Sequence, residues 1–157
     1  MAAARPLMVI NVVGLTPVMI GSRTPNLQRL ANSGFQRPLQ TVLPAVTCSV
    51  QATLLTGLLP AQHGIVGNGW YFRDLAEVGF WKQSNHLIQG EKLYQTAAMR
   101  DPAHRTAKMF WWYNMYADTA WSVTPRPSYP ADGRKIPDLY SEPAVLRDVL
   151  QEQLGRF

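Results

Sequence analysis

The stretch PAVTCSVQATLLTG, residues 44–57, decides how the rest of the chain is interpreted. Pro44 cannot lie inside a helix, and Gly57 ends the apolar run that follows, so the sequence predicts a helix from about residue 48 to residue 56. Three small polar side chains stand where this helix begins: Thr47, Cys48 and Ser49. The start of the helix is therefore a candidate site as well as a structural boundary.

Two interpretations of Thr47 fit this position. Its hydroxyl can cap the helix by accepting a hydrogen bond from one of the first free backbone N–H groups. Alternatively, Thr47 is a nucleophile in the positive field of the helix N-terminus, where an anionic phosphoryl group is also stabilised. The stretch alone leaves both interpretations open.

The composition is that of one globular domain. The chain has 157 residues, of which 46% are hydrophobic and 16% charged, and no apolar stretch approaches the roughly 20 residues that span a membrane. The apolar run at residues 7–13 is rich in β-branched residues and is interpreted as a buried strand rather than a signal peptide. The single cysteine, Cys48, excludes an internal disulfide, so the predicted location is the cytoplasm.

The formal charge of +5 comes from 15 basic and 10 acidic residues, and the basic residues are scattered. No basic run or basic helix face indicates a nucleic-acid polymer as partner. A mildly positive field instead favours a small anionic substrate.

Strand and helix patterns alternate along the chain, which indicates an α/β fold with a mainly parallel sheet. The predicted strands are residues 7–13, 35–42 and 106–112. Besides the helix at 48–56, the predicted helices are residues 25–33, 91–100 and 143–154. A glycine- and aromatic-rich segment, residues 57–90, is predicted to be an ordered loop region with short strands.

Three quoted stretches carry a family resemblance: VINVVGLTP at residues 9–17, TPNLQRLANSG at 24–34 and TCSVQATLLTGLLPAQHGIVGN at 47–68. In this order and spacing they resemble the alkaline phosphatase superfamily, in particular the type I phosphodiesterase and nucleotide pyrophosphatase branch. The resemblance implies a three-layer α/β sandwich with a mainly parallel sheet. Residues 1–157 are then expected to be the N-terminal part of a single hydrolase domain, with the fold incomplete in this chain.

The resemblance also implies a mechanism. Thr47 is expected to attack phosphorus in a small phosphate or phosphonate ester and to ligate one of two divalent metal ions, usually zinc. A threonine hydroxyl needs such activation because it is a weak nucleophile at its free pKa. The backbone N–H of Cys48 is expected to stabilise the charge that develops on the phosphoryl group.

Further residues are expected to bind substrate. Where the branch often has an asparagine three residues after the nucleophile this chain has Val50, so Ser49 and Gln51 are the candidate donors. The turn HGIVGN ends at Asn68, and Trp70 and Tyr71 follow where the family builds part of its pocket. For the two aromatic rings, packing in the core is the alternative. The candidate substrate-binding residues are Ser49, Gln51, Asn68, Trp70 and Tyr71.

The metal site departs from the family pattern. Val13 stands where the family has a metal-binding aspartate, and Asn11, two residues earlier on the same strand face, is the candidate replacement ligand. A buried, hydrogen-bonded asparagine is the alternative for Asn11. The three histidines have no metal-ligand spacing with an aspartate, so most metal ligands are expected to be absent from this chain. The alternative function is therefore a catalytically impaired family member that serves as a binding or scaffold protein.

Overall fold

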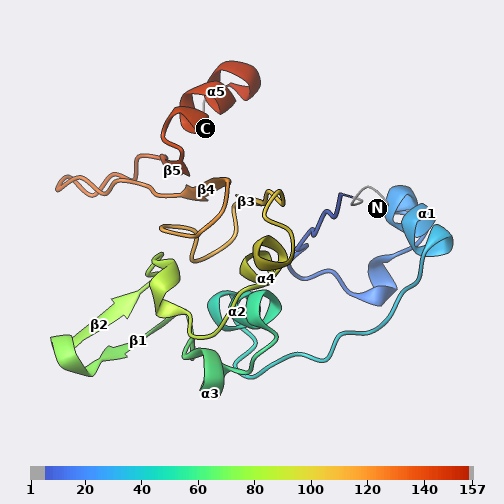
Figure 1. Ribbon diagram of the computed structural model, residues 1–157, viewed down its shortest axis with the longest axis horizontal. Helices are drawn as coiled ribbons and strands as arrows, with labels where there is room; N and C mark the ends of the chain where they lie inside the picture. The colour runs from blue at the N-terminus through green and yellow to red at the C-terminus, as the bar shows by residue number, and fades with distance from the viewer. Residues whose placement is uncertain (1–5, 156–157) are drawn as a thin grey trace. The chain divides into compact units, whose positions relative to one another are not determined.

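The computed structural model describes residues 6–155 (Figure 1). The chain divides into two compact units, residues 1–40 and 41–157. The expectation of a single hydrolase domain over residues 1–157 stays a prediction.

The first unit contains one short 3₁₀ helix, η1 (Pro17–Met19), and one α-helix, α1 (Pro25–Ser33). Helix α1 confirms the predicted helix at 25–33, and a proline occupies its first turn, where no backbone N–H donor is needed. The preceding residue, Thr24, does not cap α1 through its side chain. Its hydroxyl instead donates to the Met19 carbonyl at 2.8 Å and accepts the Gly21 N–H at 3.0 Å, which closes the turn before the helix.

The predicted strands at 7–13 and 35–42 are wrong for this structure. Neither segment pairs with another strand within residues 6–155, and their apolar side chains lie in solvent; Leu7 is 88% exposed and Phe35 83%. A run of β-branched apolar residues favours extended backbone, but it forms a β-strand only when a neighbouring strand provides hydrogen-bond partners. The sequence showed the preference and not the partner.

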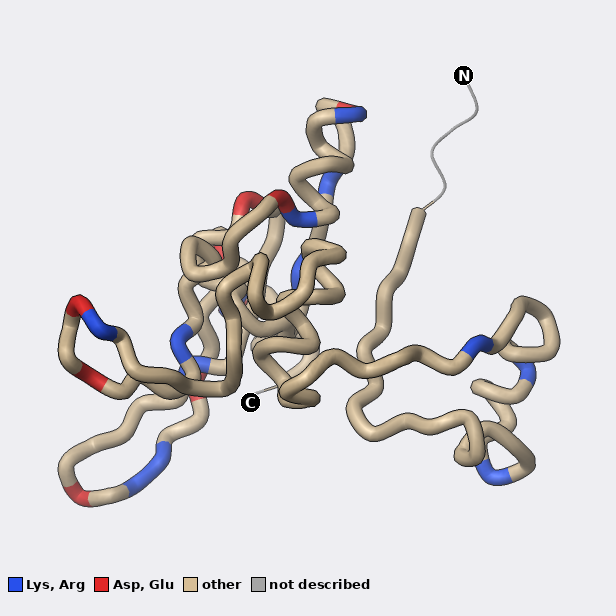
Figure 2. The backbone as a smooth tube through the Cα atoms, turned by 90° about the horizontal axis from the view of Figure 1, so that it is seen from below, with Lys and Arg blue, Asp and Glu red and all other residues tan. Residues whose placement is uncertain are grey.

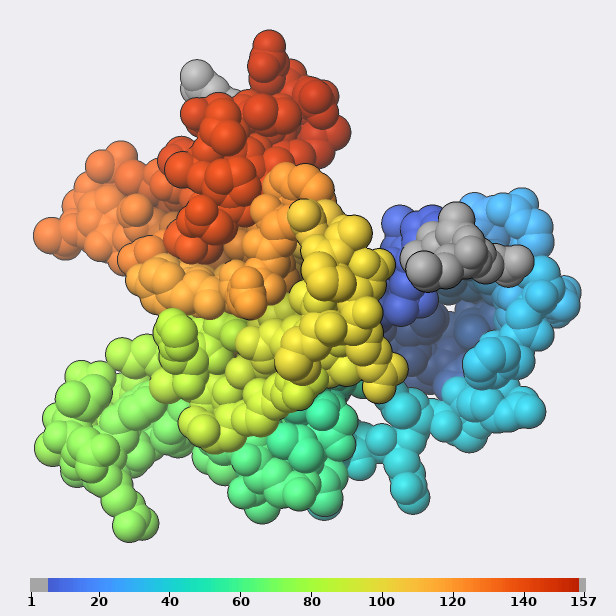
Figure 3. Space-filling view, viewed as in Figure 1, coloured from blue at the N-terminus to red at the C-terminus, as the bar shows by residue number. Residues whose placement is uncertain are grey.

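The second unit begins with α2 (Thr47–Thr56), which confirms the predicted helix at 48–56, and α3 (Pro60–His63). Gly57 ends α2 in the left-handed conformation, with φ 70°. Two antiparallel strands follow, β1 (Gly69–Phe72) and β2 (Glu77–Phe80), joined through the short 3₁₀ helix η2 (Arg73–Leu75). They form an arm that projects from the rest of the unit (Figure 3), and they confirm short strands in the loop region 57–90.

Glycines allow aromatic rings to lie flat across this arm. A Cβ atom on Gly69 would lie 2.3 Å from the Phe80 ring, and one on Gly79 would lie 2.6 Å from the Phe72 ring. Neither ring could keep its place beside a larger residue. The pairing of Gly69 with Phe80 in the ladder therefore depends on the missing side chain.

The remaining elements are η3 (Asn85–Leu87), α4 (Leu93–Arg100), β3 (Ala107–Met109), β4 (Trp121–Pro125), β5 (Leu139–Glu142) and α5 (Val145–Leu154). Strands β3 and β4 are parallel, whereas β4 and β5 are antiparallel. The helices predicted at 91–100 and 143–154 are confirmed, and the strand predicted at 106–112 is confirmed in a shorter form. The α/β class therefore holds, but the two small sheets among the described residues do not make a three-layer sandwich around a mainly parallel sheet.

The core of the second unit forms around α2 (Figure 1). Helix α4 contributes Tyr94, and the segment after β3 contributes Tyr113. The buried core residues are Cys48, Ala52, Leu55, Ile65, Ile88, Tyr94 and Tyr113. Because this core holds the helix that begins at Thr47, the start of α2 has a fixed position within the unit.

Candidate functional site

Thr47 is the first residue of α2, and Val46 is the N-cap residue. No side chain of the cap accepts a hydrogen bond from the helix, and the hydroxyl of Thr47 has no hydrogen-bond partner within the described residues. Thr47 is half-buried. The structure therefore does not show the capping role for Thr47, and it leaves the hydroxyl free at the positive end of the helix.

The two residues that follow Thr47, Cys48 and Ser49, are fully buried. Ser49 Oγ donates to the Pro44 carbonyl at 2.6 Å and also lies 3.2 Å from the Val46 carbonyl oxygen. Burial raises the pKa of the Cys48 thiol, opposed in part by a hydrogen bond with Tyr113, and so favours the protonated, unreactive form. The Ser49 side chain therefore stabilises the turn that precedes α2, and the Cys48 side chain is part of the core.

Asn68 contacts the first turn of α2 from outside the helix. Its Oδ1 accepts the backbone N–H of Cys48 at 3.0 Å, so the N–H expected to bind a phosphoryl oxygen is already bonded. This contact also fixes the orientation of the amide, because only Oδ1 can accept from an N–H group. The Nδ2 of Asn68 and the backbone N–H of Thr47 have no partner within residues 6–155 and belong to half-buried residues, so they can donate to an anion.

Gln51 lies one turn further along α2 and is buried. Its Oε1 accepts the backbone N–H of Trp112 at 2.7 Å, which ties the helix to the segment after β3. This bond commits the acceptor oxygen of Gln51 to a contact within the protein, and the expected role of Gln51 as a substrate donor stays a prediction.

The two aromatic candidates point to opposite sides of the β1–β2 arm. Trp70 is partly buried, packs against the core and stacks on Phe72 with ring centroids 5.0 Å apart. Tyr71 is 55% exposed. Only Tyr71 keeps a face available to a ligand, while Trp70 takes the core-packing alternative.

His63 is the last residue of α3 and is fully buried. Its Nδ1 accepts the N–H of Ile65 at 3.1 Å, so the ring proton is on Nε2, which donates to Thr53 Oγ1 at 3.0 Å. Both nitrogens are engaged, and burial lowers the pKa of the ring. His63 is a neutral structural group in this structure.

This burial predicts an acid-dependent loss of stability. The pKa of His63 is lower in the folded chain than its ordinary value of 6.5, so below pH 6.5 the unfolded chain binds the proton first and the free energy of unfolding falls as the pH is lowered further. Urea unfolding between pH 7.5 and 5 measures this slope. His63→Gln is expected to reduce it, whereas His104→Gln, at an exposed position, is expected to leave it unchanged; equal slopes in all three chains would contradict the assignment.

The described residues do not fit a two-metal centre. Asn11 is exposed on an extended segment of the first unit, and Val13 offers no ligand. Within residues 6–155 no group of three His, Cys, Asp or Glu side chains is assembled to hold a metal ion. The first carboxylate in the sequence is Asp74, so the segment that contains Thr47 supplies none of the hard oxygen ligands that such a site needs.

The distribution of charge carries a signal that the sequence interpretation missed. All acidic residues follow residue 73, while five arginines precede Asp74, so the net charge of +5 arises entirely in that first part. In Figure 2 the charged residues of the described N-terminal part are all basic, whereas acidic and basic residues are mixed in the later part. A nucleophile segment without nearby carboxylates in the sequence suits an anionic substrate.

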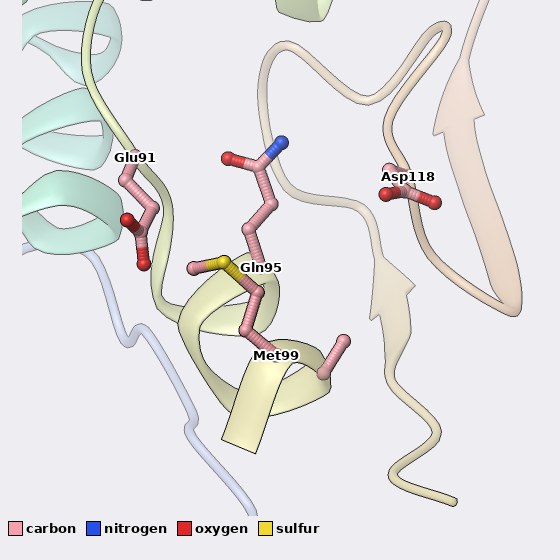
Figure 4. A pocket seen from close by; sticks show the side chains of 5 residues that line it. Glu91, Gln95, Met99 and Asp118 are labelled. Atoms are coloured by element: carbon pink, nitrogen blue, oxygen red, sulfur yellow. The ribbon is translucent and has the colours of Figure 1, made fainter. Parts of the chain in front are cut away.

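Two open pockets lie elsewhere, beside α4. The larger, of ≈ 480 Å³, is lined by Glu91, Gln95, Ala98, Met99 and Asp118 (Figure 4). Its two carboxylates repel an anion, and none of the residues predicted from the sequence lines it. The start of α2, rather than this pocket, is therefore the candidate active site.

Comparison with known proteins identifies the family of the chain. The model of the type I phosphodiesterase / nucleotide pyrophosphatase family matches residues 7–154. No solved structure matches the chain. None of the helices in the described part has the length and apolar character needed to cross a membrane. The match covers nearly the whole sequence, including Thr47 and Asn68, and the chain therefore belongs to the type I phosphodiesterase / nucleotide pyrophosphatase family of the alkaline phosphatase superfamily.

Proposed function

We propose that this protein hydrolyses small phosphate or phosphonate esters, as a phosphodiesterase or nucleotide pyrophosphatase, with Thr47 as the nucleophile. The observation that carries the proposal is the free Thr47 hydroxyl at the first position of α2, beside an Asn68 amide whose orientation is fixed by the Cys48 N–H. Family membership supports the reaction class.

In the first step the Thr47 oxygen attacks phosphorus in line with the leaving group. A phosphorus–oxygen bond to Thr47 forms, the bond to the leaving group breaks, and the threonine proton passes through solvent to the leaving-group oxygen. In the second step water attacks the phosphothreonine, and the bond to Thr47 breaks. The product is a phosphate or phosphonate and the free hydroxyl returns.

Charge stabilisation is the role of the groups around Thr47. The negative charge on the phosphoryl oxygens grows in both steps, and donors already oriented toward that charge lower the barrier. Asn68 Nδ2 and the unbonded backbone N–H of Thr47 are such donors, and the dipole of α2 adds to their effect. Cys48 acts through its backbone, by holding Asn68, rather than through its thiol.

The family is typically dependent on divalent metal ions, and zinc is the metal proposed from the resemblance. The described residues supply the nucleophile and phosphoryl-binding groups and not a ligand set, as Val13 and Asn11 show. This disagreement favours a second candidate function, a binding or scaffold protein that has lost catalysis. The cytoplasmic location inferred from the single Cys48 also remains a proposal.

Hydrolysis of bis-p-nitrophenyl phosphate with added zinc or manganese tests the role of Asn68. Asn68→Ala loses both the amide donor and the bond to Cys48, so we expect kcat to fall by about 10²- to 10³-fold and the free energy of unfolding to fall by about 1 kcal/mol. Asn68→Asp keeps an acceptor for the Cys48 N–H, so its free energy of unfolding should stay near that of wild type. Because it lacks the Nδ2 donor, its kcat should fall as much as that of Asn68→Ala.

Two results would count against this assignment. Wild-type kcat in Asn68→Asp would show that Nδ2 does not bind the phosphoryl group. No hydrolysis with either metal, together with undisturbed folding, would favour the binding or scaffold function.

A further inference from the structure

The segment after β3 has an unusual backbone conformation. Phe110 and Tyr113 adopt positive φ angles of 56° and 55° although neither is glycine. Side chains disfavour this conformation, so it persists only where surrounding contacts impose it. Trp112 lies between these two residues, and its contacts are candidates for that role.

Trp112 packs against the core and also makes two hydrogen bonds and one contact with another aromatic ring. Its backbone N–H donates to Gln51 Oε1 on α2 at 2.7 Å, and its indole N–H donates to the Lys82 carbonyl at 3.1 Å. Its ring also packs edge-on against Trp81, with centroids 5.1 Å apart and planes at 66°. Trp112 therefore joins α2 to the residues that follow β2.

Trp81 completes a path from Trp112 to Asn68. Trp81 also has a positive φ angle, of 53°. Its backbone N–H donates to the Asn68 backbone carbonyl at 2.9 Å, next to the last pair of the β1–β2 ladder. Asn68 in turn accepts the Cys48 N–H on α2. The contacts thus form a closed circuit that leaves α2 at Gln51 and returns to it at Cys48.

We propose that Gln51 and Trp112 are positioning residues that fix Asn68 against the first turn of α2. In this role neither residue needs to contact the substrate or the nucleophile, because both act through Trp81 and the backbone of Asn68. The catalytic consequence rests on the proposed function, because it assumes that Asn68 binds the phosphoryl group. The geometric part does not, since it concerns only the bond between Asn68 and Cys48.

The test compares Gln51→Met, which removes the acceptor for the Trp112 N–H at similar size, with Gln51→Glu, which retains an acceptor oxygen. Amide hydrogen exchange of Cys48 reports its bond to Asn68, because no other acceptor takes that N–H within the described residues. We expect exchange at Cys48 to accelerate about 5- to 10-fold in Gln51→Met, the loss of one hydrogen bond, and to stay near wild type in Gln51→Glu. Trp112→Phe, which removes the indole donor, should act like Gln51→Met.

Kinetics provide the second readout. Gln51→Met is expected to lower kcat for bis-p-nitrophenyl phosphate by about 10-fold with little change in KM, because misplacement of a catalytic donor weakens transition-state stabilisation. In an Asn68→Ala background the same substitution should have no further effect on kcat, since Gln51 acts through Asn68.

The outcomes separate this inference from the proposed function. Unchanged Cys48 exchange in Gln51→Met and Trp112→Phe overturns the inference, whatever the activity. Additive losses of kcat in the double variant show a general structural effect and also overturn it. Faster exchange in a chain that never hydrolyses an ester supports the positioning of Asn68 and overturns the proposed function.

Discussion

Replacing Thr47 by alanine is expected to abolish ester hydrolysis while leaving the fold intact. Loss of a covalent nucleophile lowers kcat by on the order of 10⁶-fold in well-studied hydrolases. The hydroxyl has no capping bond to lose, so the free energy of unfolding should change by less than about 0.5 kcal/mol. A capping threonine would instead cost about 1 kcal/mol on removal.

The measurement is bis-p-nitrophenyl phosphate hydrolysis with zinc or manganese, in this chain and in any longer form encoded by the same reading frame, together with urea unfolding. Thr47→Ser is the matched control, because it keeps an oxygen nucleophile at the same position and should retain much of the activity. Equal hydrolysis by wild type and Thr47→Ala would exclude Thr47 as nucleophile. A stability loss without any effect on rate would restore the capping role.

Lys108 is expected to make the protein more stable as the pH rises above 7. This side chain on β3 is 5% exposed and donates to the Tyr113 carbonyl at 2.7 Å. Burial, with a smaller contribution from the charge of Lys92, lowers its pKa from 10.5 to about 7. Between these values the unfolded chain binds a proton that the folded chain does not, so the free energy of unfolding rises with pH by up to about 1.4 kcal/mol per unit.

Urea unfolding at pH 7, 8 and 9 measures this slope, because this range ends one pH unit below about 10, the ordinary pKa of tyrosine. Lys108→Met is expected to lower the slope of the free energy of unfolding against pH by up to about 1.4 kcal/mol per pH unit. The variant is also expected to be more stable than wild type at pH 6, where the folded wild type must bury a charge. The Tyr113 carbonyl keeps its hydrogen bond from Asn85 Nδ2 in the variant. Lys135→Met, at an exposed position, should leave the slope unchanged; the same slope in all three chains would refute a deprotonated Lys108.

Local signals in the sequence were sufficient for helices α1, α2, α4 and α5, whereas the short helix α3 lies in a segment that was predicted to be a loop region. Pro44 and Gly57 bound α2, and Pro25 begins α1, because proline and glycine restrict the backbone wherever they occur. The family resemblance was equally local, since it rested on three short stretches in the right order, and the family match bears it out. These features need no knowledge of distant contacts.

Strands were predictable only where their partners are close in the sequence or present in the unit. The β1–β2 arm and the short β3 have partners, whereas residues 7–13 and 35–42 have the same apolar character and none among the described residues. The roles of the candidate site residues divide in the same way. Ser49 bonds to Pro44, five residues before it in the sequence. Gln51 bonds to Trp112, which lies 61 residues further along the chain, so this contact could not be predicted from local sequence.

The sequence by itself thus determined the family, the helix that begins at Thr47 and the reaction class that the family implies, because these depend on residue type and short spacing. The tertiary structure decided that the Thr47 hydroxyl is free, that the Cys48 N–H is bonded to Asn68, and that both ring nitrogens of the buried His63 are engaged. The physical reason is that a hydrogen bond commits each donor or acceptor to a partner. The choice of partner depends on which distant segments folding brings within about 3 Å.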